Sequence, residues 1–263
     1  NIFRDHLNWH KTLKNYIRAK SYIFRFQKRT DYLFVNANKH LIRDIVRSAP
    51  SKIVKPQLPK QLKLLVDTKL GAHYRISVAL AYSVAKHFGI AQKVIYGILK
   101  NFRGLEGREE RIATIRGIHF INDTTSTIPE ATIAALKRFR KITAKGKKLI
   151  LIAGGTDKKL DFKELAKNIK NLADRLILLP GTATKKIKRE LAVIGKNWQS
   201  AKNMGDAVNK ALEWAHREDY IILSPGATSF GQFLNEFDRG EKFVNEIRKS
   251  PHLPGIPRSL LRG

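Results

Sequence analysis

Small and polar residues follow four short apolar runs in the second half of the chain. They are Asn-Asp-Thr at 122–124, Ala-Gly-Gly-Thr-Asp-Lys at 153–158, Pro-Gly-Thr at 180–182 and Ser-Pro-Gly at 224–226. Glycines let backbone N–H groups approach an anion, and the amino termini of following helices favour negative charge. Asp123 is suited to bind ribose hydroxyls, and Lys158 is suited to bind a carboxylate or a phosphate. The residue types therefore predict a site for an anionic ligand.

The elements that must position these turns alternate between strand and helix. Each apolar run leads into a helical pattern, at 129–139, 161–173, 184–195 and 230–250. Such alternation predicts βαβ units and a mostly parallel sheet, hence an α/β fold. The carboxyl ends of parallel strands meet at one edge, where ligands of open α/β sheets bind. We call the four polar segments after the apolar runs the strand exits. For any single strand exit, an ordinary turn without a ligand remains the alternative.

The first part of the chain has a different pattern and is expected to form a separate domain. Helical spacing occurs at 11–27, 40–50, 75–90 and 92–102, a strand pattern at 30–38, and short strands with loops are expected over 51–70. The charged, glycine-punctuated segment 102–111 is interpreted as the joint. The predicted domains are therefore 1–104 and 105–263.

Composition narrows the class of protein. A hydrophobic fraction of 43% suits a packed core, and the absence of cysteine excludes disulfides and thiolate metal sites. No apolar run of about 18 residues and no signal peptide is seen, so a cytoplasmic protein without a membrane partner is expected.

The charge is strongly basic, with 51 Lys and Arg against 22 Asp and Glu, formally +29. Such a balance is typical of nucleic-acid binding, of a basic proteome, or of a surface that serves phosphorylated substrates. The basic residues are spread along the chain, and no stacking platform of spaced Phe or Tyr lies beside them. Nucleic acid is therefore not expected as a partner.

The chain begins at Asn1, inside a motif, and its only methionine is Met204. We therefore expect a fragment that lacks an amino-terminal portion. No G-x-x-x-x-G-K-[ST] loop, which would cradle the phosphates of a nucleotide, occurs in these residues.

Five segments, in chain order, resemble the Mur ligase family, the ATP-dependent amino-acid-adding enzymes of peptidoglycan synthesis. They are NIFRDHLNWHKTLKNYIRAKSYIF, GLEGREER, FINDTTSTIPEATIAALKRF, LIAGGTDKKLDF and LSPGATSFGQFLNEFDRG. The last two are most similar to the member that adds D-glutamate to UDP-N-acetylmuramoyl-L-alanine. The resemblance implies that 1–104 is the C-terminal part of a P-loop-type central ATPase domain. It also implies that 105–263 is a Rossmann-like domain that binds the amino acid.

The same resemblance implies roles for single residues. His6 and Lys20 would be catalytic and would hold Mg²⁺, with Lys20 carbamylated to a carboxylate-like oxygen ligand of the kind that hard Mg²⁺ prefers. Arg108 would reach the phosphates of ATP, and Asp123 would hold its ribose. For the incoming D-glutamate the matching residues are Thr127, Lys158, Ser229 and Phe230, of which Lys158 would also be catalytic.

The implied reaction begins when ATP phosphorylates the carboxylate of the nucleotide-linked alanine. The amine of D-glutamate then attacks the acyl phosphate, and the enzyme is expected to act as a monomer. Without a phosphate loop, this chain alone is not expected to catalyse the ligation.

Three positions depart from the family pattern. Tyr74 and Ser77 stand where the family usually has two asparagines that contact adenine, and Thr125 stands where it usually has a lysine. Alternatives are a sister Mur or folylpolyglutamate-type ligase, and a basic nucleic-acid-binding module without ligase activity.

Overall fold

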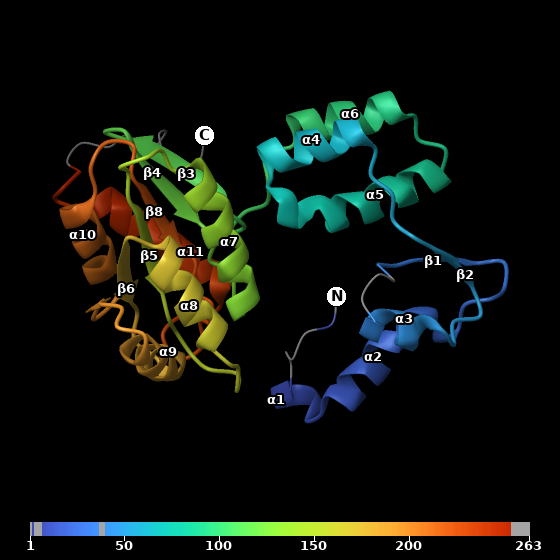
Figure 1. Ribbon diagram of the computed structural model, residues 1–263, viewed down its shortest axis with the longest axis horizontal. Helices are drawn as coiled ribbons and strands as arrows, with labels where there is room; N and C mark the ends of the chain where they lie inside the picture. Colours follow the sequence, from blue (N-terminus) through green and yellow to red (C-terminus); the bar gives the residue numbers. More distant parts are fainter. Residues whose placement is uncertain (1, 3–6, 37–39, 254–263) are drawn as a thin grey trace. The chain divides into compact units, whose positions relative to one another are not determined.

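The computed structural model describes residues 2, 7–36 and 40–253, and it divides into two compact units, Asn1–Arg103 and Gly104–Gly263 (Figure 1). His6, one of the two predicted metal ligands, lies outside the described residues. The functional assignment of each unit stays a prediction.

The first unit is mainly helical and contains one small sheet. Its elements are α1 (Leu7–His10), α2 (Leu13–Arg25), β1 (Tyr32–Phe34), α3 (His40–Val46), β2 (Lys52–Val54), α4 (Lys60–Lys69), the 3-10 turn η1 (Ala72–Tyr74), α5 (Arg75–His87) and α6 (Gln92–Asn101). Strands β1 and β2 pair in parallel. One small core gathers around Phe24 and Leu33, and another around Leu62 and Tyr82.

Strand β2 agrees with the short strand expected within 51–70, and helix α4 corrects the expectation over Lys60–Lys69. The helix begins directly after Pro59, which is its N-cap residue. Its buried residues Leu62 and Val66 are four positions apart, which places them on one helix face. The prediction was therefore wrong over Lys60–Lys69.

The second unit is an α/β fold with a six-stranded sheet. Its elements are β3 (Glu110–Ile115), β4 (Ile118–Asn122), α7 (Pro129–Ile142), β5 (Leu149–Ala153), α8 (Lys163–Leu172), β6 (Arg175–Leu178), α9 (Thr182–Val193), β7 (Gln199–Ser200), α10 (Met204–Trp214), β8 (Tyr220–Leu223) and α11 (Glu236–Lys249). The strand order is β3-β4-β8-β5-β6-β7. Only β3, paired with β4, is antiparallel in this sheet, so the predicted mostly parallel α/β fold is confirmed.

Two hydrophobic layers enclose this sheet. Helices α7, α8 and α9 cover one face, and α10 and α11 cover the other, so the strands between them are apolar on both sides (Figure 1). All five residues of β5 are fully buried, and a buried Leu or Ile side chain contributes about 1.5–3 kcal/mol relative to an exposed one. The central strands therefore fix the positions of the turns at their carboxyl ends.

Helix α10 and the short strand β7 were not anticipated. Among the described residues, no helix combines the length and the apolar character that crossing a bilayer would require.

Candidate functional site

The four predicted strand exits meet at the carboxyl edge of the sheet and are hydrogen-bonded to one another. Each contact joins one exit to the next through backbone groups. The bonds run from Gly226 N to Ser126 O (2.8 Å), from Gly154 N to Pro225 O (2.9 Å) and from Ala183 N to Gly155 O (2.9 Å). The exits thus form one connected set of loops, as parallel strands require.

A pair of threonines joins the loop that carries Lys158 to the loop after β8. Thr156 and Thr228 exchange backbone hydrogen bonds of 2.9 and 3.1 Å, and the Thr228 hydroxyl donates to the Thr156 carbonyl at 3.0 Å. The Thr156 hydroxyl donates in turn to the Phe230 carbonyl. These bonds hold the two loops in a fixed relation.

The four residues predicted for D-glutamate all lie on these connected loops. Thr127 and Lys158 are half-buried, Ser229 is 3% exposed, and Phe230 is 59% exposed. The group offers two hydroxyls, an ammonium and an aromatic ring. These are suitable groups for a carboxylate-bearing ligand, and the assignment to D-glutamate stays a prediction.

Asp123 is buried, and its carboxylate accepts three hydrogen bonds from the protein. The Ser126 and Ser224 hydroxyls donate to Oδ2 at 2.5 and 2.6 Å, and the Glu109 N–H donates to Oδ1 at 3.1 Å. Burial raises the pKa of Asp123 to about 7, against the lowering effect of the two serine hydrogen bonds. In this arrangement the carboxylate joins the exits of β4 and β8 to the segment before β3, and its assignment to ribose stays a prediction.

The raised pKa of Asp123 predicts a pH-dependent stability. Because the folded-state pKa lies above the unfolded value of 3.8, the contribution is fully present below pH 3.8 and is lost as pH rises through about 7. The unfolding free energy of the wild type minus that of Asp123→Asn should fall between pH 4 and pH 8, by at most on the order of 4 kcal/mol. Urea unfolding of both proteins across this range measures it, and a constant difference would contradict it.

The segment that carries Arg108 is anchored beside Asp123. The Gly107 carbonyl accepts hydrogen bonds from Thr125 N and Thr125 Oγ1 at 3.0 and 2.9 Å. Glu109 forms an ion pair with Arg138, and both side chains are largely buried. Arg108 itself is exposed. Thr125 therefore holds the turn that presents Arg108.

Arg239 in α11 is a positioning residue that the sequence analysis missed. It is fully buried, and its guanidinium donates to Thr124 Oγ1 (3.0 Å), Thr124 O (2.6 Å) and Ala227 O (3.0 Å). Burial lowers its pKa to about 10, and the charges of Glu236 and Asp123 oppose that change. Arg239 thereby links the exits of β4 and β8. The only sequence signal is a cation on the buried face of an amphipathic helix.

The predicted metal ligands belong to the first unit. Lys20 is exposed on α2, and its Nζ lies 5.5 Å from the centre of the Tyr16 ring. It lines a cavity of about 300 Å³ whose other walls are mostly apolar, including Phe24 and Leu33. Within residues 2, 7–36 and 40–253, no three His, Asp or Glu side chains cluster as a metal site would require.

Comparison with known families accounts for most of the chain. The model of the Mur ligase middle domain matches residues 1–75, and the model of the Mur ligase glutamate ligase domain matches residues 107–227. The UDP-N-acetylmuramoylalanine–D-glutamate ligase of Roseiflexus sp. (strain RS-1) is 35% identical over 276 residues. That alignment covers 92% of this chain and 58% of the relative. The enzyme of the same name from Borreliella afzelii (strain PKo) is 31% identical, with 92% of this chain and 57% of the relative covered.

Solved structures show the same fold at low sequence identity. The MurF ligase of Thermotoga maritima in complex with ADP has a TM-score of 0.69 at 12% identity, covering 95% of this chain and 60% of that one. E. coli FolC in complex with DHPP and ADP has a TM-score of 0.65 at 16% identity, covering 95% and 61%. The chain spans less than two thirds of each of these relatives. Two domain models of the Mur ligase family match this chain in order, and relatives at 30 to 35% identity align with more than nine-tenths of its length. The chain belongs to the Mur ligase family.

Proposed function

We propose that the complete protein is an ATP-dependent ligase that adds D-glutamate to UDP-N-acetylmuramoyl-L-alanine through an acyl phosphate. The observation that carries the proposal is the hydrogen-bonded set of strand exits, which places Thr127, Lys158, Ser229 and Phe230 on connected loops. The names of relatives aligned over 92 to 95% of this chain support the choice of substrate. We further propose that the reaction takes place in the cytoplasm and that the enzyme acts as a monomer.

Within this proposal the residues of this chain act by binding and orientation. The Lys158 ammonium attracts a carboxylate of D-glutamate, and the Ser229 and Thr127 hydroxyls orient it so that its amine reaches the acyl carbon. Arg108, exposed on its anchored turn, is available to the phosphates of ATP, and an always-charged guanidinium suits them. Asp123 acts mainly by holding the turns, since its oxygens already accept three hydrogen bonds.

Magnesium would be held by His6 and a carbamylated Lys20, and it would neutralise charge on the phosphates. Of these two residues, Lys20 lies within the part of the chain that the structure describes.

The test is ADP release by the full-length protein. We expect release only when UDP-N-acetylmuramoyl-L-alanine and D-glutamate are both present, and none from residues 1–263 alone. Equal activity with meso-diaminopimelate or L-lysine would assign the protein to a sister ligase, and activity with a folate substrate would assign it to the folylpolyglutamate type. Absence of any amino-acid-dependent ADP release would overturn the proposal.

Lys158→Ala in the full-length protein should raise the KM for D-glutamate and lower kcat/KM by about 100-fold, a loss of roughly 3 kcal/mol of transition-state binding. The matched control is Lys159→Ala, because Lys159 is the adjacent lysine and is exposed. Its kcat/KM should stay within about twofold of wild type. Steady-state kinetics with varied D-glutamate measures both, and equal losses in the two variants would contradict the role of Lys158.

A further inference from the structure

A second cavity, of about 380 Å³, lies at the amino end of β6, at the edge of the sheet opposite to the strand exits. It exists because β7 is short and pairs only with Ile177 and Leu178, so that no strand of the sheet lies beside Arg175 and Leu176 on that side. We call it the tryptophan cavity. Its lining residues are Asp174, Arg175, Leu176, Gly195, Lys196, Asn197, Trp198, Gln199 and Trp214.

Two of the three tryptophans of the chain line this cavity. Trp214 ends α10, and the Arg175 guanidinium lies 5.5 Å from the centre of its ring. Trp198 is half-buried and packs against the core beneath α8 and α9. The rings are therefore held as walls of the cavity, each with part of its surface open to solvent.

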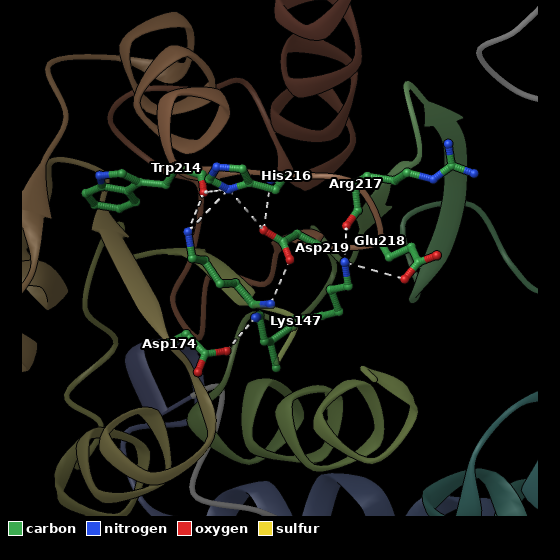
Figure 2. Close-up of polar contacts among 9 residues, drawn as sticks. Lys147, Asp174, Trp214, His216, Arg217, Glu218 and Asp219 are labelled. Atoms are coloured by element: carbon green, nitrogen blue, oxygen red, sulfur yellow. Dashed lines mark hydrogen bonds and ion pairs between the residues drawn. The ribbon is translucent and has the colours of Figure 1, made fainter. Parts of the chain in front are cut away.

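A polar network fixes the wall that contains Trp214 (Figure 2). The Lys148 ammonium donates to the Trp214 carbonyl at 2.9 Å, and the Lys148 N–H donates to the Asp219 carboxylate at 2.8 Å. The same carboxylate accepts the His216 N–H at 2.9 Å. Asp174, also a lining residue, accepts the Leu149 N–H at 2.6 Å. The cavity is thus preorganised by the amino ends of β5, β6 and β8.

The approach to the tryptophan cavity is positively charged. Helix α9 carries four basic residues and one acidic residue, and it leads through Gly195 to Lys196 in the cavity wall. Lys185 and Arg189 are exposed on this helix, and Lys188 is half-buried. The Lys196 ammonium donates to the Ala173 carbonyl at 2.6 Å. Its pKa is lowered by burial and, to a smaller extent, by Arg175, against the opposing effect of Asp174.

We propose that the tryptophan cavity and the adjoining face of α9 bind single-stranded nucleic acid. A base stacks on the tryptophan rings, and the phosphates follow Arg175, Lys196 and the basic residues of α9. Stacking on aromatic rings beside a basic groove is how proteins bind single strands with little sequence preference. The half-buried rings line a hollow that receives a flat ligand, whereas anchoring in a membrane needs rings that protrude. The tryptophan cavity lies at the edge of the sheet opposite to the strand exits, and binding there does not depend on ligase activity.

The experiment is fluorescence anisotropy of a fluorescein-labelled 12-mer of deoxythymidine with the whole chain. Because the oligonucleotide contains no adenine, its binding is not mistaken for binding at an ATP site. We expect 1 mM ATP not to displace it. With about five phosphates neutralised, by Arg175, Lys196 and three basic residues of α9, raising salt from 50 to 200 mM should weaken binding roughly 100-fold. Trp198→Leu, which keeps an apolar side chain, should weaken binding about tenfold at constant salt. Far-ultraviolet circular dichroism and the melting temperature establish that the variant is folded.

Matched controls separate this site from general attraction to a basic protein. Trp9→Leu removes the remaining tryptophan, which is 81% exposed in the first unit, and should leave affinity within about twofold of wild type. Replacing Lys185, Lys188 and Arg189 together by glutamine should reduce the slope of the logarithm of affinity against the logarithm of salt concentration by about 2. The same change at Lys202, Lys242 and Lys249, which line a different cavity beside α10 and α11, should not.

Three results would overturn the proposal. One is equal loss of binding in the two charge-reduced triples. Another is wild-type affinity in Trp198→Leu. The last is binding to phosphatidylserine vesicles with none to the oligonucleotide. A second readout is independent of these affinities. In the Trp9→Phe protein, where only the two cavity tryptophans emit, bound oligonucleotide should quench the tryptophan fluorescence, and unchanged emission at saturation would count against stacking.

Discussion

Replacing Gly181 by alanine should lower the unfolding free energy of the second unit by about 3–5 kcal/mol, among the largest effects of a single substitution. Gly181 precedes α9 with φ +143°, a conformation that side chains rarely adopt. An added Cβ would lie 2.0 Å from the Gly155 carbonyl oxygen. The atoms it would meet belong to the backbone of Gly155, which cannot rotate away as a side chain can. The clash is therefore relieved only if the two strand exits separate. Urea unfolding followed by circular dichroism measures the loss.

Gly195, just after α9, provides the matched control for Gly181. It also has a positive φ, +66°, but an added Cβ would meet no atom within 4 Å. Gly195→Ala should therefore cost only the conformational preference, about 1 kcal/mol. Equal losses in the two variants would show that backbone conformation, and not the contact with Gly155, sets the effect.

Arg239→Met should destabilise the second unit by about 3 kcal/mol or more, because two buried carbonyls lose their charged donor. The residues affected are Thr124 and Ala227, on the turns after β4 and β8. Arg239→Lys should recover only part of the loss, since an ammonium cannot reproduce the three donors of the planar guanidinium. Urea unfolding of the three proteins gives the comparison.

The control for Arg239 is Lys249→Met in the same helix. Lys249 is exposed and forms a weak pair with Glu246 at 3.7 Å, so its replacement should change the unfolding free energy by less than about 0.5 kcal/mol. A small effect of Arg239→Met, comparable to that of Lys249→Met, would mean that Arg239 does not hold the two turns together.

The alternation of strands and helices was predictable because each buried strand is a short apolar run bounded by turn residues. The runs around Ile150 and Ile222 are of this kind, and both are fully buried in the sheet. The order of these runs along the chain was therefore enough to predict that the strand exits meet at one edge of the sheet. Helix α10 does carry a sequence signal, since its buried residues Met204, Ala207, Val208, Ala211 and Leu212 recur at helical spacing after the N-cap Asn203, and this signal was overlooked.

The inner partners of the site could not be predicted, because they depend on contacts between distant residues. Asp123 is an acid at a strand exit in the sequence, which suggested a ligand contact. Its bond to Ser224 joins residues far apart in the chain. The same holds for Arg239 and Thr124. Likewise, no local pattern brings Trp198 and Trp214 to one cavity, because the two side chains pack against the hydrophobic layers on opposite faces of the sheet.

The position of β8 affects how this unit is made on the ribosome. Strands β4 and β5 are successive along the chain, yet β8 lies between them and pairs with both. Until residues 220–223 emerge, the earlier strands have two apolar edges with unfilled backbone hydrogen bonds, and such edges pair readily with other chains. The nascent unit should thus be most prone to aggregation just before its last strand is synthesised. Closure of the sheet is then a late, long-range step, which makes folding slow.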